Sequence, residues 1–273
     1  MKILLAIGIS FFSIIAVGQE KLDPNKYYAE SMTIFLESKV YGKQRELQIF
    51  IPDEYIRNNE KAFKILYLFD AQNSRIFNYI SGIVQLMSMN TIEPVIIVGI
   101  ATEDRWDEFL PLNNHIETLK RYEPPIGHAD KLIEHIQSEV EPYLKANYRI
   151  NDYRMAIGHS LGATFVTYAA FKTENLFDYC ILLSPNYSYD EKQFVSRFKD
   201  FVKSNLTRKK EFYFANGFGD NYEKEFDEPL QEVLAILQSS KNDKISWKYK
   251  NLDIDNHGLI WLGVYNGLLN WKK

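Results

Sequence analysis

The sequence is poor in cysteine and has no concentration of positive charge. Cys180 is the single cysteine, so no disulfide can form within the chain, and stability must come from a hydrophobic core. Because Cys180 lies in an apolar, strand-like run, we interpret it as a small buried residue and not as a catalytic thiol. The net charge is −4 and the densest basic run covers only residues 208–210, which argues against a nucleic-acid partner.

Long apolar runs are also scarce, and the one that stands out is at the N-terminus. Lys2 precedes an apolar run over residues 3–17, and Ala16 and Gly18 supply small residues at its end. This pattern is typical of a secretory signal peptide over residues 1–18. The run is shorter than the roughly 20 residues of a spanning helix; an uncleaved anchor is the alternative. We therefore expect a periplasmic or secreted protein, with no stable membrane insertion after cleavage, whose residues 19–273 form a single domain.

The rest of the chain is 46% hydrophobic and 15% aromatic, as expected of a globular protein with a large core. Residues 31–40 and 44–51 alternate apolar and polar side chains, which predicts an antiparallel pair with one wet face. Residues 65–69 and 95–100 are continuously apolar, which is typical of parallel strands covered on both faces. The alternation of such strands with helical patterns predicts an α/β fold: a mostly parallel central sheet, led by antiparallel strands, with helices on both faces. We expect further strands over 153–157, 179–183, 211–215 and 245–250, helices over 75–89, 129–145, 161–172, 190–204, 223–239 and 259–271, and one long irregular loop over 102–128.

The most informative motif is Gly158-His159-Ser160-Leu161-Gly162, which matches G-x-S-x-G. An apolar run precedes it and a helical pattern follows, as in the strand-to-helix turn that exposes a nucleophilic serine. Glycines at both ends allow the strand and the helix to approach closely. Ser160 is the candidate nucleophile.

A serine nucleophile needs a base and an acid further along the chain. His257 lies in a polar turn between the last predicted strand and the last helix, where a doubly wound sheet presents such a group. The acid should follow residues 211–215. Asp220, at the end of a glycine-containing turn, is our preferred candidate. Glu223, which is next, and Glu225 compete with it, but both fit the first turn of the following helix, where negative charge favours the helix dipole.

The oxyanion formed during attack needs two N–H donors. One is the backbone N–H of Leu161, directly after the serine. The second should come from the loop after residues 65–69, where we favour the backbone N–H of Gln72 over that of Ala71. Asp70 is interpreted as a turn-forming or helix-capping residue.

Several segments together resemble the putative esterase family of the α/β-hydrolase superfamily, which includes esterase D-like, enterobactin esterase-like and feruloyl esterase-like enzymes. The resemblance covers about residues 28–271. One departure is Ala163, where the family often has a second glycine. The segments that carry the resemblance are residues 67–72, 96–100, 105–108, 139–144, 158–162 and 257–258.

The resemblance implies the α/β-hydrolase fold and a serine carboxylic-ester hydrolase with a Ser-Asp-His triad and an acyl-enzyme intermediate, without cofactor or metal. The ester would belong to a siderophore, an acetylated or feruloylated polysaccharide, or another small molecule. Two alternatives remain open: a catalytically inactive binding protein with the hydrolase fold, and an acyltransferase that shares the acyl-enzyme. The loops over 102–128 and 184–195 are expected to roof the site, and Trp106, Phe109, Tyr122, Tyr187 and Tyr189 are candidate aromatic walls.

Overall fold

The computed structural model describes residues 26, 28–113, 115–121 and 127–271. The predicted signal peptide, residues 1–18, lies outside the described residues.

The fold is built on one eight-stranded sheet with the strand order β1-β2-β4-β3-β5-β6-β7-β8. β1 pairs with β2 and β2 with β4 in antiparallel fashion, and every other pair is parallel. This confirms the mostly parallel sheet led by an antiparallel pair. The strands are β1 Glu30–Ser38, β2 Lys43–Ile51, β3 Phe63–Phe69, β4 Val95–Ile100, β5 Ile150–His159, β6 Tyr179–Leu183, β7 Lys210–Asn216 and β8 Ile245–Asn251.

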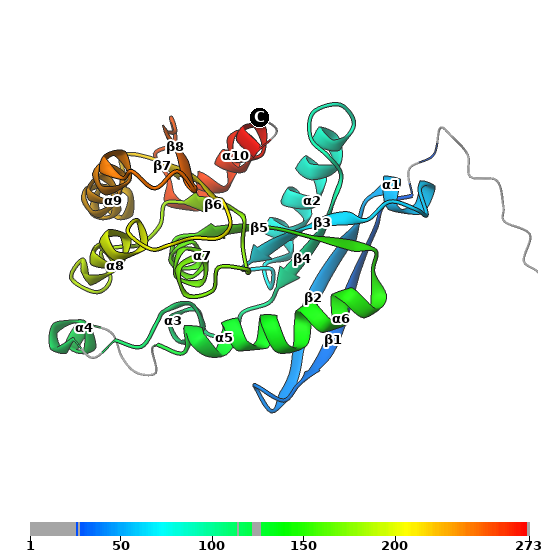
Figure 1. The fold of residues 1–273 in the computed structure, drawn as a ribbon, viewed down its shortest axis with the longest axis horizontal. Coiled ribbons are helices and arrows are strands. Elements are labelled where there is room, and N and C mark those ends of the chain that lie inside the picture. The colour runs from blue at the N-terminus through cyan, green and yellow to red at the C-terminus, as the bar shows by residue number, and fades with distance from the viewer. Residues whose placement is uncertain (1–25, 27, 114, 122–126, 272–273) are drawn as a thin grey trace, which may run out of the picture.

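Helices cover both faces of the sheet, and Figure 1 shows α2 and α10 on one side with α5, α6, α7 and α8 on the other. Successive residues of a strand point to opposite faces, so Ala156 of β5 packs with the second group, whereas Met155 and Ile157 pack with α2 and α10. The helices are α1 Asp53–Arg57, α2 Ser74–Ser88, α3 Arg105–Phe109, α4 Ile116–Arg121, α5 Ala129–His135, α6 Glu141–Asn147, α7 Leu161–Lys172, α8 Gln193–Phe201, α9 Asn221–Ser239 and α10 Val264–Trp271, with a 3₁₀ segment over His257–Gly263.

Two segments differ from the sequence-based expectation. The region 102–128 is not simply irregular, because it contains the short helices α3 and α4. The helix expected over 129–145 passes through a π-helical segment, Ile136–Val140, between α5 and α6. Pro142 lies in the first turn of α6. Proline has no N–H to donate and its ring clashes with the preceding turn. The wider π-helical turn accommodates it, so the helix continues.

Within the described ranges, no helix is both long and apolar enough to cross a membrane. Cys180 is fully buried in β6, and burial raises the pKa of its thiol to about 12. It is a core residue, as its apolar surroundings predicted.

Candidate active site

Ser160 lies at the turn between β5 and α7 in a strained conformation. Its φ is 56° and its ψ −120°, a positive φ that is uncommon for a residue with a side chain. Position 158 has no room for a side chain, because a Cβ there would lie 2.3 Å from the carbonyl oxygen of Gly162. Leu161 is the first residue of α7, so its N–H has no hydrogen-bond acceptor within the helix. The turn therefore presents both a hydroxyl and a backbone donor.

His257 begins the 3₁₀ segment after β8, in the polar turn that the sequence predicted. Its ring lies among three others: the His159 ring with centroids 4.3 Å apart, and the Tyr222 and Phe226 rings at 5.3 and 5.4 Å. This packing restricts how the imidazole can rotate. The His159 ring, which packs against that of His257, is itself buried.

Glu223 is the carboxylate that meets the His257 ring. Its Oε1 lies 2.5 Å from Nδ1 of His257. Its Oε2 accepts hydrogen bonds from the Ser184 hydroxyl at 2.8 Å and from the Gly217 N–H at 2.7 Å. The side chain is fully buried, so these contacts fix its position. A buried carboxylate next to Nδ1 favours the tautomer that carries its proton there.

Asp220, our preferred candidate for the acid, meets the backbone of His257, whereas Glu223 meets its ring. Its Oδ2 accepts from the backbone N–H of His257 at 2.5 Å, and its Oδ1 accepts from the N–H of Glu223 at 2.9 Å. Asp220 is the N-cap of α9. The sequence contained a signal for this arrangement: Asp220 stands directly before a helical pattern, where an aspartate is a favoured N-cap whose side chain accepts from an N–H of the first turn.

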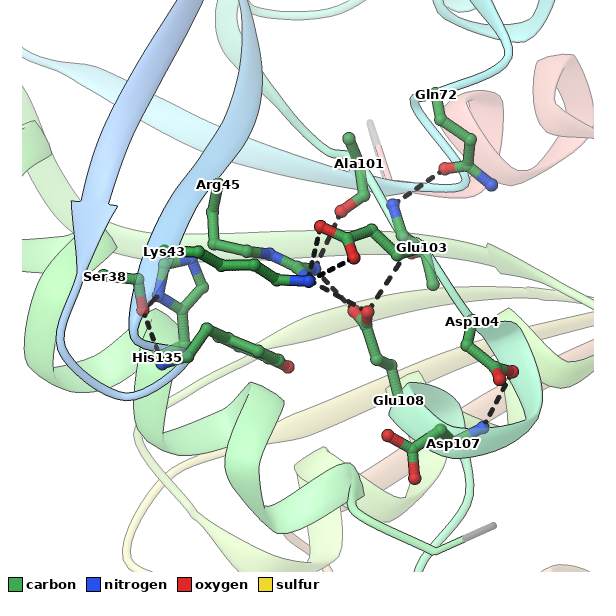
Figure 2. A network of polar contacts seen from close by, with 12 residues as sticks. Ser38, Lys43, Arg45, Gln72, Ala101, Glu103, Asp104, Asp107, Glu108 and His135 are labelled. Carbon is green, nitrogen blue, oxygen red and sulfur yellow. Dashed lines mark hydrogen bonds and ion pairs between the residues drawn. The ribbon is translucent and has the colours of Figure 1, made fainter. Parts of the chain in front are cut away.

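The loop after β3 offers a backbone donor at Gln72. The N–H of Ala71 donates to the carbonyl of Ile100 at 3.2 Å, whereas among the described residues no acceptor is found for the N–H of Gln72. The side chain of Gln72 turns away toward the β4–α3 loop, where its Oε1 accepts the Thr102 N–H at 2.9 Å (Figure 2).

Arg105 joins this loop to the serine turn. Its Nε donates to Oδ1 of Asp70 at 2.7 Å, and its Nη2 donates to Oδ2 at 3.1 Å and to the His159 carbonyl at 3.2 Å. Asp70 has a φ of 66°, so the ion pair secures a strained turn. Glu108, on the same helix as Arg105, pairs instead with Arg45.

A pocket of about 460 Å³ opens at this edge of the sheet, and both Ser160 and His257 line it. The described residues show no hydrogen bond between the Ser160 hydroxyl and the His257 ring, so the hydroxyl is open to the pocket. Apolar and aromatic surface comes from α3, α7 and α9. The remaining lining residues are Arg105, Trp106, His159, Leu161, Asn186, Tyr222, Glu225 and Phe226.

The aromatic residues chosen from the sequence divide into two groups. Trp106 lines the pocket, whereas Phe109, Tyr187 and Tyr189 are buried in the core and form no wall of it. Tyr122 lies outside the described residues. Tyr222 and Phe226 were missed, because their helical spacing on α9 indicates only which face is buried.

Within residues 26, 28–113, 115–121 and 127–271, no cluster of three or more His, Cys, Asp and Glu side chains is arranged to hold a metal ion.

A strand-turn-helix serine, a histidine after the last strand and a carboxylate after the preceding one define an α/β-hydrolase arrangement. The family profile described as Putative esterase matches residues 38–259. The chain belongs to this family and is an ester hydrolase. A search among curated proteins finds no match.

Solved structures share the fold. An IroE-like serine hydrolase from Shewanella oneidensis superposes with a TM-score of 0.77 at 22% identity, covering 88% of this chain and 79% of that one. The BES protein from Bacillus cereus gives a TM-score of 0.74 at 20% identity, with 92% and 97% covered. A protein titled enterobactin and salmochelin hydrolase IroE gives 0.61 at 17% identity, with 90% and 95% covered.

Proposed function

We propose that this ester hydrolase is a serine enzyme in which Ser160, His257 and Glu223 act as a catalytic triad through an acyl-enzyme intermediate. The observation that carries the proposal is the 2.5 Å contact between Nδ1 of His257 and Glu223, made by a ring that shares a pocket with Ser160. With the Nδ1 proton held by Glu223, Nε2 is left as a proton acceptor facing the pocket.

The reaction begins when Ser160 Oγ attacks the ester carbonyl and its proton passes to Nε2 of His257. The buried Glu223 carboxylate stabilises the imidazolium, and the N–H groups of Leu161 and Gln72 donate to the oxyanion. The intermediate collapses to the acyl-enzyme as the alcohol leaves with the proton from Nε2. Water, deprotonated by His257, then attacks the acyl-enzyme, and the carboxylic acid and Ser160 are released. Serine and histidine need only form their hydrogen bond once substrate is bound.

The substrate we propose is a small or polysaccharide-borne ester. Trp106, Tyr222 and Phe226 provide aromatic surface beside the reacting groups, which suits siderophore or feruloyl groups. A siderophore hydrolase from Aspergillus nidulans and a ferulic acid esterase share this fold. Turnover of a panel of siderophore, feruloyl and acetyl esters would identify the class, and this proposal fails if only simple synthetic esters are cleaved.

Replacement of the nucleophile tests the mechanism. The Ser160→Ala variant should hydrolyse p-nitrophenyl acetate about 10⁴- to 10⁶-fold more slowly than the wild type, since the triad acts as a unit. Circular dichroism and thermal unfolding verify that the variant is folded. Equal turnover by the folded variant would contradict the proposal, and a wild type with no turnover on any ester would favour the inactive binding protein.

We also propose export to the periplasm or outside the cell, supported by the signal-peptide pattern of residues 1–18. N-terminal sequencing of the protein from its native host should begin at Gln19, and an intact Met1 would oppose export with cleavage.

A further inference from the structure

Asn186 is a pocket residue to which the proposed mechanism gives no task. It follows β6 and packs directly on the serine turn, because its backbone N–H donates to the Ser160 carbonyl at 3.4 Å and its carbonyl accepts from the Thr164 hydroxyl at 2.9 Å. The residue is 94% buried and lines the same pocket as Ser160 and His257.

The orientation of its amide is fixed by Ser188. The backbone N–H of Ser188 lies 3.2 Å from Oδ1 of Asn186, and a backbone N–H can only donate, so the atom it meets must be the amide oxygen. The Ser188 hydroxyl lies 2.9 Å from the same oxygen. The amide nitrogen is therefore at the opposite end, and among the described residues no acceptor is found for it. Asn186 lines the pocket, so a molecule bound there can supply the acceptor that its amide nitrogen lacks.

The position of Asn186 indicates which part of an ester it would meet. Strands β3 and β6 flank β5, so Gln72 and Asn186 lie on opposite sides of Ser160. The carbonyl oxygen of the ester belongs on the Gln72 side, because the proposed mechanism assigns the Gln72 N–H as a donor to it. The Ser188 hydroxyl also contacts Glu225 of α9, the helix whose Tyr222 and Phe226 rings contact His257. The leaving oxygen takes its proton from His257, so the alcohol portion belongs on the same side as Asn186.

We propose that Asn186 is a specificity-determining residue whose Nδ2 donates a hydrogen bond to an oxygen in the alcohol portion of the ester. The inference rests on the proposed function. The pocket then prefers esters whose alcohol carries a second oxygen close to the scissile bond, as the esters of polyols and of hydroxy acids do. Esters of plain alkyl alcohols leave the amide unpaired and react more slowly.

Two acetates isolate this contact. Butyl acetate and 2-methoxyethyl acetate share the acyl group and the chain length, and differ by one CH₂ replaced by oxygen. The quantity to measure is the ratio of kcat/KM for the ether-containing ester to that for butyl acetate. Comparing the ratio between variants cancels the intrinsic reactivity of the two esters.

In Asn186→Asp, an oxygen replaces the NH₂ while Oδ1 still accepts from Ser188. The ratio should fall about 3- to 10-fold from the wild-type value, the usual effect of losing one neutral hydrogen bond. Asn186→Ala should show the same fall without a new charge, which covers the case in which the aspartate variant does not fold. Asn205→Asp, the same change at an exposed position, should keep the wild-type ratio.

A ratio within twofold of wild type in Asn186→Asp and Asn186→Ala would overturn the inference. It would leave the proposed function standing, because Ser160 would still hydrolyse both esters. A wild type that cleaves neither acetate and does not react with a fluorophosphonate would instead overturn the proposed function, and the inference with it.

Discussion

Two carboxylates lie beside His257 at the residue scale, and they hold different atoms. Glu223 meets the ring, while Asp220 holds the backbone N–H and caps α9. In the proposed mechanism the first contact orients the base and balances its charge, and the second positions the turn that carries His257. Replacing each carboxylate by its amide should distinguish the two roles.

Glu223→Gln should lower kcat by about 10³- to 10⁴-fold, because the imidazolium loses its charged partner and the tautomer is no longer fixed. Asp220→Asn should lose far less, since asparagine is as good a helix cap as aspartate. Steady-state kinetics on p-nitrophenyl acetate measure both. Equal losses in the two variants, or a larger loss in Asp220→Asn, would contradict the assignment of Glu223.

The sequence alone predicted where Ser160 and His257 lie, because each follows a strand whose apolar pattern is clear. The strand pattern could not decide whether Asp220 or Glu223 meets the His257 ring. The two are three residues apart at a helix N-terminus, and the direction of each side chain depends on a turn whose Gly219 has a φ of 99°. Ser184, which donates to Glu223, carries no local signal, since its contact crosses from β6 to α9.

At the scale of elements, a buried ion pair joins the β1–β2 hairpin to α3. Nη1 and Nη2 of Arg45 donate to the two oxygens of Glu108 at 3.0 and 2.5 Å, and Nη2 also donates to the Ala101 carbonyl at 3.0 Å (Figure 2). Both side chains are buried. Because α3 also carries Arg105 and Trp106 into the pocket, the pair links a distant hairpin to the site wall.

Glu108→Ala should reduce the free energy of unfolding by up to about 3–5 kcal/mol, because the buried Arg45 charge loses its closest partner and keeps the Ala101 carbonyl and the more distant Glu103, 3.6 Å away. Urea denaturation measures the change. Glu117→Gln, which removes the carboxylate of an exposed ion pair with Lys120, is the matched control and should leave the unfolding midpoint unchanged. Similar effects of the two substitutions would contradict a structural role for the buried pair.

Elements with a clear pattern of apolar residues were predictable from the sequence, whereas elements held by contacts with distant residues were not. The alternation in β1 and β2 and the apolar runs of β3 and β4 are local properties, and the structure confirms them. The five-residue helix α3 depends on the Asp104 cap and on the pairing of Glu108 with a strand 63 residues away. No pattern within residues 102–128 contains that second contact.

At the scale of the whole molecule, two buried histidines make stability depend on pH. Burial lowers the pKa of His135, although Glu139 opposes this, and burial together with the nearby His257 holds the pKa of His159 well below its usual value. A histidine whose pKa is lower in the folded state stabilises the fold above its unfolded pKa. That contribution is lost as the pH falls toward the folded value.

The free energy of unfolding should therefore be nearly constant between pH 7 and 8 and should fall below about pH 6.5, by up to about 1.4 kcal/mol per pH unit for each histidine. Urea denaturation at pH 7.5, 6.0 and 5.0 gives the slope. His135→Gln should make this slope shallower. A slope that His135→Gln does not change would refute this origin of the pH dependence.

The central claim is that Ser160 is an activated nucleophile, and covalent labelling with a fluorophosphonate tests it most directly. Mass spectrometry of the wild-type protein should show one adduct per chain on the peptide containing Ser160, with no adduct in Ser160→Ala and much slower labelling in Glu223→Gln. A wild-type protein that stays unlabelled, or an adduct that maps to another residue and persists in Ser160→Ala, would contradict the account.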